Sequence, residues 1–161
     1  MTVDIRNILY CTDLSQNAAH AFGYAVALAK LTGADIHVLH VVEELSSDAK
    51  VTLQAYIMDD GARHKALEER VEQAKAYLQK RIEKFWKDAG KDDRAVRGRI
   101  KSIDVIEAYP AEQILRSAID KDCDLVVMGA HEKGLSQNFL GGVAKSVLRR
   151  SRIPTLIVPL P

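Results

Sequence analysis

Cysteine is scarce in this sequence, and the placement of its two cysteines excludes several classes of protein. Cys11 and Cys123 stand alone among 161 residues, and they form neither a CxxC motif nor a cluster with histidines at metal-ligand spacing. Both lie in or beside apolar runs, which favours two buried, reduced thiols over a disulfide or a redox pair. We therefore expect a cytoplasmic protein without a metal site.

A charge excess and a long apolar segment are also missing. The formal net charge is +1, so no overall field attracts nucleic acid or an anionic membrane surface. No apolar stretch approaches the length of a membrane span, and the first residues lack the basic and apolar regions of a signal peptide. We therefore expect neither nucleic acid nor a membrane among the partners.

Motifs of the common nucleotide-binding and catalytic classes are not found either. The glycine-rich stretch at 129–146 has no G-K-[ST] and is not a G-x-G-x-x-G motif, which excludes a Walker A loop and a dinucleotide fingerprint. Paired carboxylates and an activated nucleophile are not evident near it. His131 is the one candidate base there, and a loop histidine is more often solvated than catalytic. We therefore do not expect an enzyme, although slow ATP hydrolysis as a side activity stays open.

What the sequence does contain is a regular alternation of apolar runs and helical patterns. Its length and its 47% hydrophobic content fit one globular domain over residues 1–161. Alternating strands and helices predict an α/β fold with a parallel sheet, because each helix serves as a crossover between strands. The five expected strands lie at 6–13, 34–44, 99–108, 123–130 and 153–161.

The helical segments have recognisable ends. Ser15 is expected as an N-cap, Gly33 as a C-terminal stop, and Pro110 as the first residue of a later helix. A long helix is expected from about Asp59, after a loop with possible helical turns at 45–60, and its apolar stripe favours packing on a sheet over a coiled coil. The residues expected to face the core are Ala18, Ala21, Phe22, Ala25, Ala29, Leu67, Val71, Ala74, Leu78, Ile82, Phe85, Ile114, Leu115, Ala118, Ile119, Val143, Val147 and Leu148.

Helices can cover both faces of such a sheet only if the winding direction reverses once. At the reversal, loops diverge from the carboxyl ends of adjacent strands and leave a crevice where ligands bind. Thr12 and Asp13 follow the first strand, and Gly129 follows the fourth. Asp13 can accept hydrogen bonds from a ligand or cap the next helix, and its residue type alone favours capping.

The glycine-rich stretch has two open interpretations. Gly141 and Gly142 begin a helical pattern, whose unpaired N–H groups and partial positive charge suit an anion. Lys145 and Ser146 lie in its first turns as further donors. However, strand-to-helix turns commonly use glycine anyway, so the glycines by themselves do not establish a phosphate site.

Three segments together resemble the universal stress protein family over essentially the whole chain. They are "NILYCTDLSQNAAHAFGYAVALAKLTGADIHVLHV", "YPAEQIL" and "DLVVMGAHEKGLSQNFLGGVAKSVLRRSRIPTLIVP". The resemblance implies a flavodoxin-like, Rossmann-type sheet with strand order 3-2-1-4-5 and helices on both faces. It also implies a homodimer through the last strand, "TLIVP", which is apolar and would be an exposed edge in a monomer.

The resemblance further implies a site for ATP or another adenine nucleotide, with or without Mg²⁺. Binding members of the family share a motif of glycine, two residues, glycine, nine residues, glycine and then Ser or Thr. Asp13 matches the acidic residue that contacts the nucleoside, and Val41 matches the apolar residue that packs on adenine. The nucleotide-binding residues that the resemblance implies are Cys11, Thr12, Asp13, Val41, Met128, Gly129, His131, Gly141, Gly142 and Val143.

This sequence departs from that motif on the phosphate side. Glu132 occupies the second glycine position, the spacer is one residue shorter, and Gly142 occupies the hydroxyl position, while Lys133 adds a positive charge. We expect an adenine-nucleotide-binding regulatory protein of the stress response, with weaker or less triphosphate-selective binding than the full motif gives. The alternative is a nucleotide-independent dimeric interaction module, with the long helix and residues 45–60 as partner surfaces.

Overall fold

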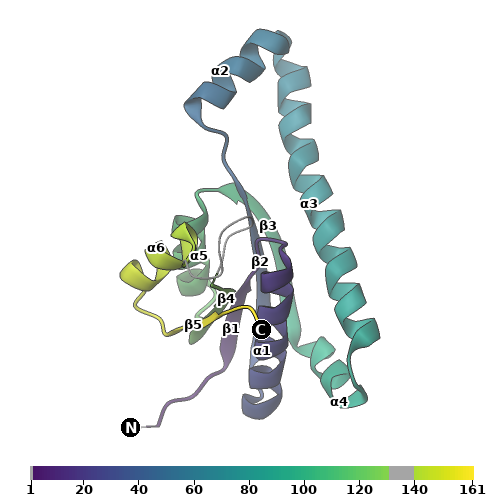
Figure 1. Cartoon of the computed structure of the whole chain (residues 1–161), viewed down its shortest axis with the longest axis vertical. Coiled ribbons are helices and arrows are strands. Elements are labelled where there is room, and N and C mark those ends of the chain that lie inside the picture. The colour runs from purple at the N-terminus through teal and green to yellow at the C-terminus, as the bar shows by residue number, and fades with distance from the viewer. Residues whose placement is uncertain (1, 131–139) are drawn as a thin grey trace.

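The structure, a computed structural model, describes residues 2–130 and 140–161. It contains one parallel sheet of five strands in the order β3-β2-β1-β4-β5 (Figure 1). The predicted fold class and strand order are therefore confirmed. The strands are β1 (Asn7–Cys11), β2 (Asp35–Glu43), β3 (Ile100–Ala108), β4 (Leu125–Gly129) and β5 (Thr155–Val158).

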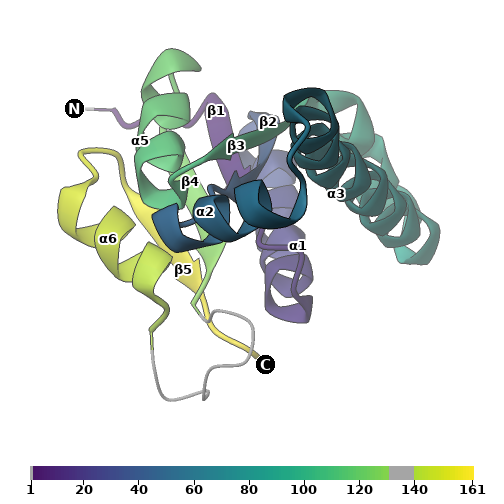
Figure 2. The ribbon, with the colours of Figure 1, turned by 90° about the horizontal axis from the view of Figure 1, so that it is seen from above.

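Helices pack on both faces of this sheet, as Figures 1 and 2 show. Alternate strand residues point to opposite faces, so β2 sends Val38 toward one set of helices and Leu39 toward the other. The first face is covered by α1 (Gln16–Thr32) and α3 (Asp60–Asp88), and the second by α5 (Pro110–Asp120) and α6 (Gly142–Arg150).

The predicted helix ends are confirmed by their hydrogen bonds and dihedral angles. Ser15 is the N-cap of α1, and its hydroxyl accepts the N–H of Ala18 at 3.2 Å. Gly33 ends α1 with φ of 76°, the left-handed conformation that glycine adopts without strain. Pro110 is the first residue of α5, where its missing N–H costs no helical hydrogen bond.

The segment at 45–60, expected as a loop with helical turns, contains a regular ten-residue helix, α2 (Ser47–Tyr56), with Ser46 as its N-cap. None of its residues is buried, so the apolar periodicity that identifies packed helices is weak here. The helix α2 and the first half of α3 extend beyond the sheet (Figure 1). After α3 the chain forms α4 (Lys91–Arg94) and the 3-10 turn η1 (Ala95–Arg99) before β3.

Three expected core residues lie outside the core, and one of them, Leu67 in the first half of α3, is only half-buried. Ile119 is 68% exposed and Leu148 is 46% exposed, because each stands one position beyond a buried neighbour on its helix, Ala118 and Val147. In α3, Trp86 is buried although the predicted stripe stopped at Phe85. None of the helices formed by residues 2–130 and 140–161 combines the length and apolarity that a membrane crossing requires.

Candidate functional site

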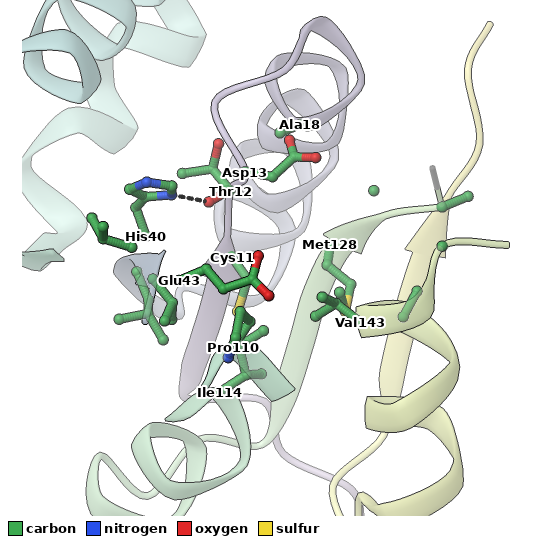
Figure 3. Close-up of a pocket in the computed structure, with 17 residues that line it drawn as sticks. Cys11, Thr12, Asp13, Ala18, His40, Glu43, Pro110, Ile114, Met128 and Val143 are labelled. Carbon is green, nitrogen blue, oxygen red and sulfur yellow. Dashed lines mark hydrogen bonds between the residues drawn. The ribbon is translucent and has the colours of Figure 1, made fainter. Parts of the chain in front are cut away.

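A cavity of about 500 Å³ opens at the carboxyl ends of β1, β2 and β4, where the winding of the sheet reverses (Figure 3). Its volume lies in the range typical of small-molecule sites. The cavity brings together residues from both strand ends that the topology singled out. The predicted site residues that line it are Cys11, Thr12, Asp13, Val41, Met128, Gly129, Gly141 and Val143.

Two predicted site residues are not in this lining. Gly142 is the first residue of α6, beside the cavity, but it does not line it. His131 lies outside the described residues, as do Glu132 and Lys133 of the altered motif. The first-turn donors that were expected from α6, including Lys145, do not line the cavity either.

The floor of the cavity is apolar. It is formed by buried side chains of the core between the sheet and the helices α5 and α6, including Leu39, Ile114 and Met128. Cys11 also lies there, and burial raises the pKa of its thiol, so this group stays neutral. Cys123 is likewise buried, with a pKa raised by burial to about 11, and the prediction of two buried free thiols is confirmed.

Asp13 stands in a tight turn after β1. Its Oδ1 accepts the N–H of Ser15 at 2.9 Å, and the hydroxyl of Thr12 accepts the N–H of Leu14 at 3.0 Å. Leu14 has φ of 67°, a strained conformation for a residue with a side chain. The capping role favoured for Asp13 is therefore wrong, because Ser15 is the N-cap of α1. The exposed Asp13 carboxylate instead lines the cavity.

His40, a residue that sequence reasoning did not select, fastens β2 to this turn. Its Nδ1 donates a hydrogen bond to the carbonyl of Thr12 at 2.7 Å (Figure 3). A carbonyl only accepts, so Nδ1 carries the proton. The N–H of Thr12 in turn donates to the carbonyl of Leu39 at 3.0 Å. In the sequence, the feature that could have selected His40 as a site residue was its position near the end of a predicted strand.

Gly129 is required at its position by the close approach of α1. A Cβ atom built there would lie 2.4 Å from Nδ2 and 3.1 Å from Cγ of Asn17. Asn17 is itself buried in the first turn of α1, so its side chain has little room to move away. The first glycine of the motif thus has a packing reason that is independent of any phosphate.

The N-terminus of α6 faces one end of the cavity. Gly141 is its N-cap, and the helix has no side-chain cap. The N–H of Gly141 donates to the carbonyl of Ala130 at 2.8 Å, which holds the helix start beside the end of β4. A helix N-terminus carries a partial positive charge and suits an anion. This end of the cavity is therefore its anion-favouring end.

The charged side chains in the described lining are both acidic, Asp13 and Glu43. Sequence reasoning missed Glu43, although its place two residues beyond Val41 puts both on one face of β2. Pro110 and Ala144 also line the cavity. They could not be selected from the sequence, because they reach the cavity only when α5 and α6 pack beside the strand ends. No three His, Cys, Asp or Glu side chains gather as a metal site anywhere in residues 2–130 and 140–161.

Comparisons with known proteins agree with this architecture. A model of the universal stress protein family matches residues 4–159. The universal stress protein MJ0577 of Methanocaldococcus jannaschii is 29% identical over 159 residues, which are 98% of this chain and 97% of that protein. Its solved structure is similar with a TM-score of 0.74, at 23% identity over 99% of each chain.

Two further solved structures with the same fold carry nucleotides. A universal stress protein in complex with cAMP is similar with a TM-score of 0.60, at 17% identity over 97% of this chain and 98% of the other. A universal stress protein of Archaeoglobus fulgidus in complex with dAMP is similar with a TM-score of 0.51, at 14% identity over 98% of this chain and 99% of the other.

Proposed function

Because this chain belongs to the universal stress protein family, we propose that its cavity binds an adenine nucleotide and that the protein acts as a nucleotide-dependent regulator in stress responses. The observation that carries this proposal is the meeting of Asp13, Gly129 and the N-terminus of α6 around one cavity of about 500 Å³. The relatives bound to cAMP and dAMP support it.

Each part of the cavity suits one part of a nucleotide. The apolar floor around Val41 and Ile114 offers a purine base a place away from water. The carboxylate of Asp13, at the end of β1, accepts hydrogen bonds from ribose hydroxyls. The N-terminus of α6 receives the phosphate. In this assignment the nucleotide lies across the ends of β2, β1 and β4.

One phosphate fits the described lining better than three. Asp13 and Glu43 are acidic, and the described lining contains no Lys or Arg to offset the charge of a polyphosphate. At an effective dielectric near 20, two like charges about 5 Å apart repel by roughly 3 kcal/mol. Mg²⁺ bound to ATP lowers this repulsion, so the metal enters with the nucleotide rather than through a site of its own.

Isothermal titration with AMP, ADP and ATP, each with and without Mg²⁺, tests the proposal. We expect AMP to bind without Mg²⁺ and ATP to bind more weakly unless Mg²⁺ is present. Replacing Glu132 with glycine restores the second glycine of the family motif, so E132G should tighten ATP binding. Absence of heat and of a thermal shift for all three nucleotides would remove the proposal.

The proposed assembly is a homodimer through β5, which works in the cytoplasm and holds its nucleotide without turnover. Support comes from the place of β5 at the sheet edge, where Thr155, Leu156 and Ile157 are only partly buried. Exposed apolar edges invite pairing with a second copy. Sedimentation equilibrium measures this directly. Absence of ATP turnover in the wild-type protein would support the binding role, and a slow residual turnover that H131A leaves unchanged would exclude His131 as its base.

A second candidate is the nucleotide-independent interaction module. It is favoured by α2 and the first half of α3, which extend beyond the sheet with Tyr56 and Met58 about 85% exposed. Large contiguous apolar patches mark partner surfaces, and in this candidate Tyr56 and Met58 belong to such a patch. Mass spectrometry of the purified protein separates the candidates, because a co-purified adenine nucleotide contradicts nucleotide independence.

A further inference from the structure

Glu43 is the last residue of β2, and it shares one face of that strand with Val41 and Leu39. All three line the cavity. In Figure 3, Glu43 lies on the same side of the cavity as Pro110 and Ile114, while Met128 and Val143 lie on the other side. The Glu43 side chain thus projects from the β2 side into the cavity, while the N-terminus of α6, with Val143, is on the other side.

The Glu43 carboxylate has no partner within the part of the chain that the structure describes: it makes neither a hydrogen bond nor an ion pair there. Arg70 contacts the main chain of Glu43 rather than its carboxylate. Its Nη2 donates to the main-chain carbonyl of Glu43 at 3.2 Å, and its Nη1 lies 4.0 Å from Oε2 of Glu107. Arg70 therefore holds the backbone of Glu43, and the exposed carboxylate remains an acceptor without a protein partner at the cavity.

The charges of the cavity determine which way a nucleotide lies in it. The phosphate is attracted to the N-terminus of α6 and repelled by Glu43 and Asp13, so it lies at the α6 end. The base then lies at the β2 end, against Val41 and Ile114 and beside Glu43. A carboxylate accepts hydrogen bonds and cannot donate them, so the base edge that meets Glu43 must present a donor.

We propose that Glu43 determines base specificity by accepting a hydrogen bond from the exocyclic amino group of adenine; this inference rests on the proposed function. Hypoxanthine carries a carbonyl oxygen in place of that amino group. An oxygen in the place of the amino group gains no hydrogen bond from the Glu43 carboxylate and is repelled by it, and the N1–H of hypoxanthine can reach the carboxylate only if the base shifts. Glu43 is exposed in the free protein, so the discrimination comes from the lost hydrogen bond to a charged acceptor and from the repulsion of the oxygen.

Titration of AMP, IMP and purine riboside 5′-monophosphate into the purified full-length protein tests this inference. IMP replaces the amino group by an oxygen and carries a proton on N1, whereas purine riboside 5′-monophosphate lacks the amino group and keeps N1 unprotonated, so it should bind more weakly than AMP by a similar factor. We expect AMP to bind about 10- to 100-fold more tightly than IMP, the ratio for one hydrogen bond to a charged acceptor. In E43Q the amide can accept from the amino group or donate to the carbonyl, so the ratio should fall to within about threefold.

The matched control is E44Q, which removes the same charge one residue further along. Glu44 does not line the cavity, and its main-chain N–H donates to the carbonyl of Ala108 at 3.2 Å, a bond that the substitution keeps. E44Q should retain the wild-type ratio of AMP to IMP affinity. Circular dichroism of each variant verifies that the fold is unchanged.

The outcomes separate this inference from the proposed function. AMP binding with an AMP-to-IMP ratio that E43Q leaves unchanged overturns the role of Glu43 alone. A loss of affinity in E43Q that is equal for AMP and IMP also overturns it, because the residue then contacts the sugar or only supports the cavity. Absence of binding for both nucleotides to the wild-type protein overturns the proposed function, and this inference with it.

Discussion

The two faces of the sheet are packed in different ways. On the face covered by α1 and α3, aromatic rings fill the space: Phe22 stacks on Tyr10 with ring centroids 4.8 Å apart and contacts Phe85 at 4.6 Å and Trp86 at 5.8 Å. On the face covered by α5 and α6, the buried cluster of described residues contains aliphatic and sulfur-bearing side chains and no aromatic ring. The cavity of about 500 Å³ opens on this second face.

This difference explains how one sheet can be stably packed on one face and still have room for a ligand on the other. Aromatic side chains bury large areas, so the first face supplies much of the packing. The shorter side chains of the second face, such as Cys11 and Ala144, leave room at the strand ends. In the proposed function, the flat ring of the base occupies the space that an aromatic side chain occupies on the opposite face.

The largest expected effect comes from breaking the filled face. Phe22 is 3% exposed, and F22A removes a ring that contacts three others. We expect the free energy of unfolding to fall by about 3–5 kcal/mol, which urea denaturation measures. AMP affinity of the folded fraction should stay within about twofold of wild type, because the cavity is on the other face. A large loss of affinity would contradict the separation of the two faces.

The opposite kind of substitution adds a ring to the face of the sheet that carries the cavity. Val41 lines the cavity and is only partly buried, so V41W places an indole in the space proposed for the base. We expect AMP affinity to fall at least about 100-fold, or about 2.7 kcal/mol, in isothermal titration. The urea midpoint should remain close to that of wild type, since the added ring enters existing space. Unchanged AMP binding would show that the base lies elsewhere.

A smaller effect is expected where the first turn of α1 meets the end of β4. The Cβ of G129A would come within 2.4 Å of the Asn17 amide, so that buried side chain must shift. We expect a loss of about 1–3 kcal/mol in the free energy of unfolding, the usual range for overpacking. The double variant N17A/G129A should be more stable than the sum of the two single effects. Strict additivity would contradict a direct clash.

The smallest effect concerns a polar row at the amino end of the second face. His37 lies 2.8 Å from the Ser102 hydroxyl through Nδ1 and 3.2 Å from Oδ1 of Asn7 through Nε2. Burial, with a contribution from Lys121, lowers the pKa of His37. The folded state therefore disfavours the charged imidazole, whereas the unfolded chain takes up a proton near its ordinary pKa of about 6.5.

The sign of the pH dependence follows from this shift. The contribution of His37 to stability is fully present above the unfolded pKa, and it is lost as pH falls through the folded pKa. We expect the urea midpoint of wild type to drop between pH 7.5 and pH 5, and H37Q to show a shallower drop. H64Q is the control, because His64 lies on the exposed side of α3. Equal slopes in wild type and H37Q would contradict the assignment.

Local patterns in the sequence predicted most elements of the fold. Ser15, Gly33 and Pro110 marked helix ends because capping and φ preferences act within a few residues. The same patterns misjudged the 45–60 segment, since α2 buries no residue and so leaves no strong apolar period. Ile119 and Leu148 were wrong because periodicity gives a helix face only to within about one residue.

Strand ends and motif positions in the sequence predicted the location of the candidate site, but its chemistry required contacts between distant segments. Asp13 and Gly129 could be selected because parallel strands end at one edge of a sheet. The bond from His40 to the Thr12 carbonyl and the unpaired carboxylate of Glu43 join elements that are far apart in the chain. No local pattern specifies such pairings.

By itself, then, the sequence determined the alternation of strands and helices, the family and the edge of the sheet that carries the cavity, because these follow from short-range periodicity and from a motif. The tertiary structure alone decided that one face is filled by rings while the other stays open. It also decided that Gly129 packs against Asn17 so closely that a Cβ atom would force the Asn17 side chain to shift. The physical reason is that packing and electrostatics act between side chains that only the folded chain brings within a few ångströms.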